Sequence, residues 1–202
     1  MKRSNILSKK VISKYAKDIV IRTELSDFDY GILERNNINP AFISGKLISI
    51  EFQSLGCYYR GIGIKNCNRG CEFFCDVYNP SFLTLGRSGL IHIKKRNRKD
   101  YMSAMVFTNI RDYLSFCTKE EMKENVKYEN ADFIILNEPK NFSHAVSLCN
   151  NYSQIYCFLP PTLSGIMMFM TIKDVVQSGQ VEMISHSKYL INKGKYNIYC
   201  IV

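Results

Sequence analysis

The sequence has no uninterrupted apolar run approaching the roughly 18–20 residues that a helix needs to span a bilayer, so a membrane protein is not expected. The basic N-terminus leads into VISKYAKDIVI, which Lys and Asp interrupt, so this stretch is not a signal-peptide core. No phosphate-loop spacing surrounds Gly61, Gly63 or Gly70. The 202 residues, 46% of them hydrophobic, predict instead one sizeable core, or one core with a small satellite.

Cysteine pairs with the C-x2-C spacing of zinc knuckles are also absent. The eight cysteines are scattered over stretches that resemble buried strands, which favours a reducing cytoplasm over a disulfide scaffold. Cys71 and Cys75 would lie about 13 Å apart along an extended strand, too far to share a metal without a bulge. Structural thiols are the favoured interpretation, and the residues leave open whether a metal is bound by Cys57, Cys67, Cys71 and Cys75.

One strand–helix junction lacks the polar groups that catalysis needs. Residues 155–159 predict a buried strand that Pro160-Pro161 ends, and Thr162 can cap the apolar helix that follows. Enzymes of α/β type place their chemistry where strands end and helices begin. The stretch QIYCFLPPTLSG, from Gln154 to Gly165, has no carboxylate, no His and no glycine-rich loop. The sequence therefore predicts a strand–helix junction where an active site would lie, but without catalytic side chains.

A second junction lies upstream, where SAMVF (103–107) predicts another buried strand before the amphipathic helix IRDYLSFCT. The two junctions and the segment DFIILNEPKNFSHAVSLCNNYSQIYCFL between them resemble the Toprim domain of DnaG-type primases and topoisomerases. The resemblance is greatest to primase-like Toprim proteins carried by mobile elements of Bacteroidetes. It covers roughly residues 26–190 and implies the Toprim fold. Two departures are that no Cys-rich zinc ribbon precedes the helical region and that INKGKYNIYC replaces the Asp-bearing tail.

The resemblance also implies where acidic residues should stand. Thr108 and Asn109 occupy the places of the family's Glu-Gly pair, and Pro160 and Thr162 occupy those of its two Asp residues. The family's phosphoryl transfer is implied to need Mg²⁺ on the Asp pair, and Mg²⁺ prefers carboxylate oxygens. Asp112 is interpreted as a partner of the helix dipole. We therefore expect no enzyme activity and no cofactor, with vestigial positions at Thr108, Asn109, Asp112, Pro160, Thr162 and Gly165.

The positive charge is uneven. Lys plus Arg outnumber Asp plus Glu by 27 to 18, and basic clusters of this kind favour phosphate backbones. A solvated loop and a frayed terminus are the alternative interpretation of the charge runs. Tyr58 and Tyr59 could stack on bases, although strand aromatics are more often cross-strand partners. The candidate nucleic-acid-binding residues are Lys94, Lys95, Arg96, Arg98, Lys99, Lys9, Lys10, Tyr58, Tyr59 and Arg60.

The expected architecture is α/β (α+β overall): a Toprim-like, largely parallel sheet flanked by helices, preceded by a small helical region and an antiparallel hairpin. We expect an N-terminal region (1–85), a basic linker (86–102) and a Toprim-like domain (103–202). A basic helix is expected over about 5–17, further helices begin near Ser26 and Asn39, and strands are expected over 47–52, 58–64 and 71–77. Beyond residue 102, strands are expected over 103–107, 132–136, 154–159 and 180–184, and helices over 109–117, 141–149 and 163–177.

Two functions from different classes follow. The favoured one is an inactive Toprim-like module that binds DNA or RNA electrostatically in mobile-element DNA metabolism. The alternative is a protein-interaction module that docks a replication or mobilisation protein, with an exposed apolar patch and no affinity for nucleic acid. The three histidines (His92, His144 and His186) do not assemble a site by their positions in the sequence.

Overall fold

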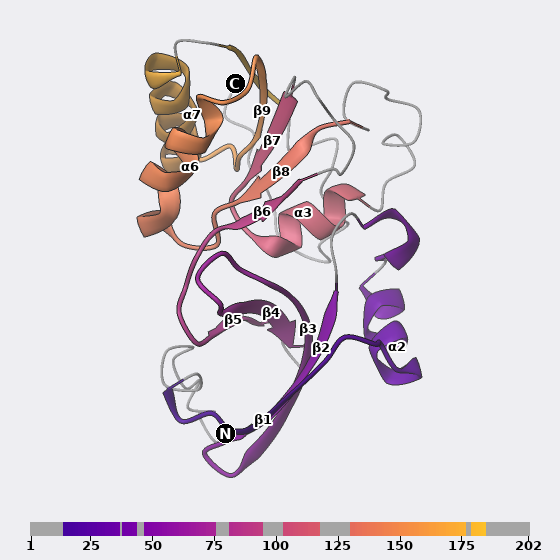
Figure 1. Cartoon of the computed structure of the whole chain (residues 1–202). Helices are drawn as coiled ribbons and strands as arrows, with labels where there is room; N and C mark the ends of the chain where they lie inside the picture. Colours follow the sequence, from indigo (N-terminus) through magenta and orange to yellow (C-terminus); the bar gives the residue numbers. More distant parts are fainter. Residues whose placement is uncertain are drawn as a thin grey trace, which may run out of the picture.

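The computed structural model describes residues 14–36, 38–43, 47–75, 81–94, 103–117, 130–176 and 179–184. These residues form two five-stranded sheets, one in the N-terminal and one in the C-terminal half of the chain (Figure 1). The architecture is mixed α/β, as expected. No helix in the described ranges is both long and apolar enough to cross a membrane.

The first sheet is antiparallel, with its strands in chain order. Its strands are β1 (Lys17–Arg22), β2 (Ile48–Ser54), β3 (Cys57–Lys65), β4 (Cys71–Cys75) and β5 (Ser81–Leu85). Leu55 and Gly56 both have positive φ, 51° and 77°, and make a two-residue turn whose twist suits the β2–β3 hairpin. The expected hairpin is thus part of a larger sheet. The expected basic helix is wrong at its end, because strand β1 begins at Lys17; its residues 5–13 lie outside the described ranges.

Between β1 and β2 the chain forms α2 (Asp27–Arg35) and the single turn η1 (Pro40–Phe42). The expected starts of both are confirmed. Ser26 caps α2 in a reciprocal capping box with Asp29, and Asn39 accepts a bond from the backbone of Ala41 to cap η1.

The second sheet has the order β10-β9-β7-β8-β6, and the neighbours among its first four strands are parallel. Its strands are β6 (Ile91–Ile93), β7 (Ser103–Phe107), β8 (Asp132–Ile135), β9 (Gln154–Phe158) and β10 (Gln180–Met183). The edge strand β6 runs antiparallel to β8 and comes from the stretch expected to be a basic linker. Every strand and helix expected after residue 102 is present within two residues of its expected ends.

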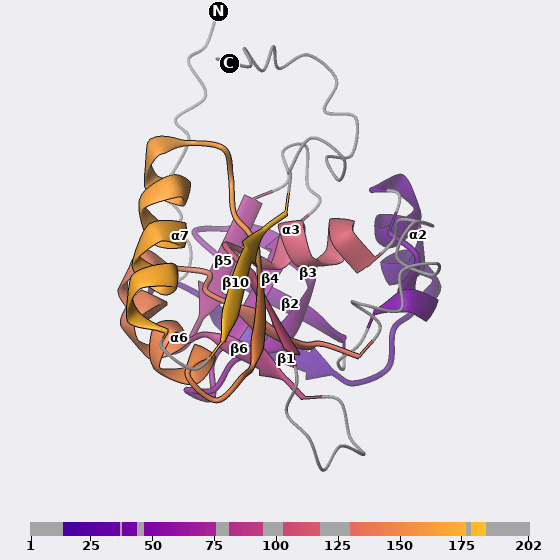
Figure 2. The same ribbon diagram turned by 90° about the horizontal axis from the view of Figure 1, so that it is seen from above.

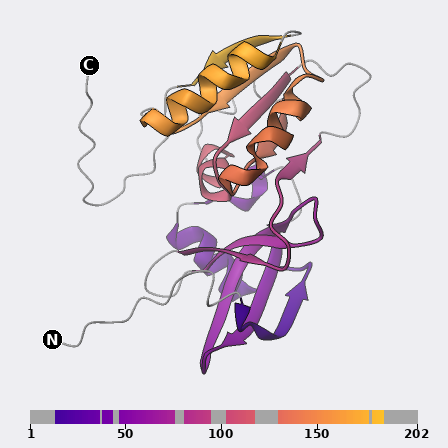
Figure 3. The same cartoon turned by 90° about the vertical axis from the view of Figure 1, so that its left-hand side faces the viewer.

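Helices cover both faces of this sheet (Figures 2 and 3). On one face lie α6 (Phe142–Cys149), which follows the turn η2 (Pro139–Asn141), and α7 (Leu163–Val175). On the other lies α3 (Ile110–Cys117), with α2 beside it. The core on the α3 side includes Ile32 of α2, Ile62 of β3, Phe107 of β7 and Phe116 of α3. Because this one core draws side chains from both halves of the chain, the first sheet is held firmly against the carboxyl half.

Candidate functional site

The two strand–helix junctions singled out in the sequence meet at the carboxyl edge of the parallel sheet. In the register of the sheet, Phe107 of β7 lies between Ile135 of β8 and Phe158 of β9. The backbone N–H of Asn137 donates to the carbonyl of Thr108 at 2.9 Å, which joins the β8 end to the β7 end. The structure therefore brings together the two strand–helix junctions that the sequence predicts.

At the β7 end, the Asp112 carboxylate is bonded by its own neighbours. The carboxylate Oδ2 of Asp112 accepts bonds from the Thr108 hydroxyl at 2.5 Å and from Asn109 Nδ2 at 2.7 Å. The backbone N–H of Asp112 donates to Asn109 Oδ1 at 3.0 Å. Asn109 and Asp112 thus satisfy each other as a cap on the first turn of α3. This arrangement gives the carboxylate a structural role in starting the helix.

At the β9 end, Pro160 and Thr162 shape the turn into α7. The backbone N–H of Thr162 donates to the carbonyl of Pro160 at 2.8 Å, and the Thr162 hydroxyl accepts from the N–H of Gly165 at 3.3 Å. A Cβ atom on Gly165 would lie 2.0 Å from the Pro160 carbonyl oxygen. Gly165 is therefore required by the close approach of the helix to the strand end.

At the β8 end, Asn137 adopts a positive φ of 60°, which Asn tolerates better than most residues. The next residue, Glu138, forms an ion pair with Lys140 at 2.8 Å. Across the residues that the structure describes, no group of three His, Cys, Asp or Glu side chains is placed to hold a metal ion.

Two loops of the first half lie beside this edge and bear exposed arginines. Asn66 Oδ1 accepts from the backbone N–H groups of Asn68 and Gly70, each at 2.9 Å, while its Nδ2 donates to the carbonyl of Arg87 at 2.8 Å. A Cβ atom on Gly70 would lie 2.1 Å from that same carbonyl, so the loops are in direct contact. The second loop continues to Gly89, whose carbonyl is 3.5 Å from Asn137 Nδ2.

The guanidinium groups of these loops were not among the expected binding residues. Arg69 and Arg87 are both exposed, and within the described ranges neither has an ion-pair partner. Arg69 also has a positive φ of 62°, at the tip of the β3–β4 turn. The Asn68-Arg69-Gly70 turn signal was visible in the sequence, but its proximity to Arg87 depends on the fold.

The structure describes only some of the expected nucleic-acid-binding residues, and these differ in exposure and contacts. Lys94 is exposed at the end of β6. Tyr58 is 58% exposed, whereas the ring of Tyr59 stacks on Phe52 with centroids 5.1 Å apart. The remaining lysines and arginines lie outside the described residues: Lys9, Lys10, Lys95, Arg96, Arg98 and Lys99.

Arg60 lies in an ion-pair network that fixes α2 to the first sheet. Its Nη2 is 3.1 Å from Asp29 Oδ2, its Nε is 3.3 Å from Glu51 Oε1, and its guanidinium lies 4.5 Å from the ring centroid of Phe28. Burial alone would raise the pKa of Asp29, but hydrogen bonds from Arg60 and Ser26 outweigh it and hold that pKa below its usual range. The geometry gives Arg60 a structural role.

The opposite, amino edge of the parallel sheet holds a chain of three titratable side chains. The Tyr152 hydroxyl donates to Asp132 Oδ2 at 2.8 Å and lies 2.9 Å from His92 Nε2. Burial lowers the pKa of His92, and nearby Lys94 lowers it further. Sequence reasoning missed this grouping because the three residues come from separate segments.

Among the residues that the structure describes, the thiols form no group of three or more that could hold a metal ion. Cys57 and Cys67 are exposed. Cys57 begins the nine-residue strand β3 and Cys67 follows its other end, so the two lie roughly 30 Å apart. Cys71 is buried. Burial raises the pKa of Cys149 to about 12 and raises that of Cys157 as well. The backbone of Cys75 lies in β4.

No family model and no curated protein matches this chain. The solved structures that are similar to it include two that contain a bacteriophage T7 primase. One is the primase fragment of the bacteriophage T7 primase-helicase protein, at 12% identity and a TM-score of 0.44, covering 82% of this chain and 65%, just under two thirds, of the phage chain. The other is described as bacteriophage T7 lagging-strand DNA polymerase interacting with primase domains bound to an RNA/DNA hybrid and dTTP. It shows 13% identity and a TM-score of 0.43, with coverage of 81% and 79%.

Proposed function

We propose that this chain is a catalytically inactive Toprim-like module that binds nucleic acid electrostatically in the DNA metabolism of a mobile element. The observation that supports this function most directly is the contrast at the carboxyl edge. Asp112 and Glu138 are both occupied locally, by a helix cap and by Lys140, while Arg69 and Arg87 stand exposed on loops that contact the β8 end of this edge through Gly89.

Such an arrangement suits phosphate contact and disfavours metal-assisted chemistry. A nucleic-acid backbone is bound mainly by Lys and Arg, whose contacts release condensed counterions. Phosphoryl transfer instead needs carboxylates free to hold Mg²⁺. This edge presents exposed guanidinium groups that can contact phosphates. Its acids Asp112 and Glu138 are already bonded to neighbouring side chains and are not free to hold Mg²⁺. Lys94 is exposed at the end of β6, toward the amino edge of the sheet, and is therefore a positive position separate from these arginines.

The test is fluorescence anisotropy of labelled single- and double-stranded DNA and RNA across a salt series, with Mg²⁺ and with EDTA. We expect binding that weakens linearly in log salt and is the same in EDTA. The double variant Arg69→Gln/Arg87→Gln should reduce the slope by about 0.9 per lost duplex phosphate contact, or about 0.7 on a single strand. Strict dependence on Mg²⁺ would instead indicate a working metal site.

A matched control removes an equal charge elsewhere. Lys173, on the exposed side of α7, is replaced by Gln and compared with Arg87→Gln alone. Lys173→Gln should leave the affinity nearly unchanged if binding is local to the loops. Equal weakening by both variants would mean that only the overall charge matters.

The alternative function, docking of a replication or mobilisation protein, is supported by a different observation. Five apolar side chains of α7 stand exposed on the surface, and the first four follow the spacing of one helix face: Leu163 (75%), Ile166 (47%), Met167 (61%), Met170 (48%) and Val175 (46%). A stripe of this kind is typical of protein interaction sites. Absence of nucleic-acid binding at low salt in the same anisotropy series would favour this second function.

A further inference from the structure

The edge strand β1 exposes three consecutive apolar side chains in its middle. All six of its residues are exposed, including Ile19 (47%), Val20 (42%) and Ile21 (42%). Three consecutive apolar residues on an extended strand point to both faces of the sheet, so burial of one face alone could not cover them.

Within the described ranges, β1 pairs with β2 on one side and with no strand on the other. A long apolar edge of this kind is a template for pairing with another strand. The register slips between Lys17 and Val20, where Asp18 has a positive φ of 54°. This bulge bends the strand near its start, which keeps any added ladder short.

Charge along the strand indicates the direction of the added strand. Lys14, Lys17 and Asp18 stand at its start, with a net positive charge, and Glu24 follows its end, while Arg22 is already paired with Glu51 at 2.7 Å. An antiparallel second copy would bring the positive start of one strand to the acidic end of the other, twice by symmetry. A parallel copy would instead bring like charges together.

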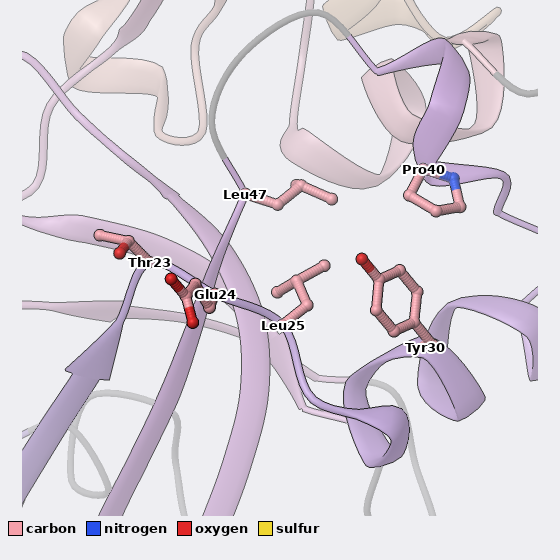
Figure 4. A pocket seen from close by; sticks show the side chains of 6 residues that line it. All are labelled: Thr23, Glu24, Leu25, Tyr30, Pro40 and Leu47. Atoms are coloured by element: carbon pink, nitrogen blue, oxygen red, sulfur yellow. The ribbon is translucent and has the colours of Figure 1, made fainter.

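A pocket of about 490 Å³ lies just beyond the end of β1, as Figure 4 shows. The side chains of Leu25, Tyr30, Pro40 and Leu47 point toward this shared space. Tyr15, which immediately precedes β1, is 51% exposed. Antiparallel pairing places the residues before one strand beside the residues after the other, so the second copy's Tyr15 would reach this pocket.

We propose that two copies of this chain associate through antiparallel pairing of their β1 strands, with each Tyr15 entering the pocket of the other copy. One two-fold interface then accounts for three separate features: the free apolar edge, the opposite charges at its ends and the pocket past its end. The interaction is independent of nucleic-acid binding.

The first test is the mass of the full chain by sedimentation over a concentration series. We expect the mass to rise from one chain to two. Val20→Lys, which places a charge at the centre of the edge, should raise the dissociation constant at least about tenfold. Met167→Lys on α7, an equally polar change at a residue 61% exposed, is the matched control and should leave the constant unchanged.

Two further variants test the orientation. Lys14→Glu and Glu24→Lys should each weaken association, because each places like charges together at both ends, and their combination should restore it. Val20→Cys should form a disulfide-linked dimer under oxidation, since directly opposed residues of antiparallel strands have Cα atoms about 4.5–5.5 Å apart. The wild type, with Cys57 and Cys67 exposed, is the control for unrelated cross-links.

A chain that keeps a one-chain mass at every concentration would overturn the proposal and leave another segment or another protein as the partner of β1. So would a dimer that Val20→Lys does not affect. Loss of nucleic-acid binding by Arg69→Gln/Arg87→Gln has no bearing on these outcomes, so the two proposals fail separately.

Discussion

The two edges of the parallel sheet hold their polar groups in different ways. At the carboxyl edge, Thr108, Asn109 and Asp112 bond one another across no more than four positions of the chain. At the amino edge, His92, Tyr152 and Asp132 are joined across 60 and 20 positions. The first edge uses polar side chains to begin a helix, and the second uses them to tie separate segments together. A strand edge rich in polar atoms is thus not by itself a site of chemistry.

The largest expected effect comes from Gly165→Ala at the carboxyl edge. The new Cβ would lie 2.0 Å from the Pro160 carbonyl, so the start of α7 must shift away from β9. We expect a loss of about 3 kcal/mol in the free energy of unfolding, measured in urea. The control is Gly31→Ala in α2, where the nearest atom is the end of the Arg35 side chain at 3.5 Å. That substitution should stabilise by up to about 1 kcal/mol through helix propensity, and a similar loss in both variants would contradict the contact argument.

At the amino edge, Tyr152→Phe removes the hydroxyl that joins His92 to Asp132. Asp132 is only 6% exposed and would lose a donor, which we expect to cost about 1–3 kcal/mol in the free energy of unfolding. Urea unfolding of the variant checks this, with the spectrum of the folded state confirming that the sheet is retained. An unchanged midpoint would mean that water replaces the hydroxyl and that the chain of three is not a tie between segments.

The same edge should make stability depend on pH. Because the pKa of His92 is lowered below its ordinary value of 6.5, the unfolded chain binds the proton more readily than the folded one. The contribution of His92 to the free energy of unfolding is therefore fully present above about pH 6.5 and is lost as the pH drops toward the pKa of the folded state. His92→Gln should remove this part of the slope in a series of unfolding curves between about pH 5 and 7.5, a range that brackets the usual His value.

The smallest effect is expected from Asp112→Asn. Loss of the charged cap should cost about 0.5–1 kcal/mol, and nucleic-acid affinity in Mg²⁺ and in EDTA should remain equal. This variant separates a helix cap from a metal ligand at the same position. Any Mg²⁺-dependent step in binding that disappears with Asp112→Asn would assign the carboxylate to a metal after all.

Local signals made much of the second sheet predictable. Pro160-Pro161, Thr162 and the apolar run before them defined the end of β9 and the start of α7 within the chain itself. The same holds for Asn109 at the start of α3. Caps and strand ends are decided by neighbours in sequence, which is why the junctions at the carboxyl edge were found correctly.

The features that were missed depend on tertiary contacts. β1 was not predicted, and its first residue, Lys17, was assigned to the end of a helix, because the strand is short and is stabilised by pairing with β2. β6 has only three residues, too few for any periodicity to show. Arg69 and Arg87 become neighbours only because Gly70 packs on the second loop, and the role of Arg60 depends on a buried Asp29 31 positions away.

The exposed and buried cysteines differ in reactivity, so their modification reports how far the chain is unfolded. Thiolates are the reactive form, and the raised pKa values of Cys149 and Cys157 keep those two thiols protonated and inaccessible in the folded chain. Cys57 and Cys67, at the surface, are open to an alkylating reagent at once. The order in which a maleimide modifies these four cysteines would therefore distinguish local opening of the folded chain from complete unfolding, without an introduced cysteine.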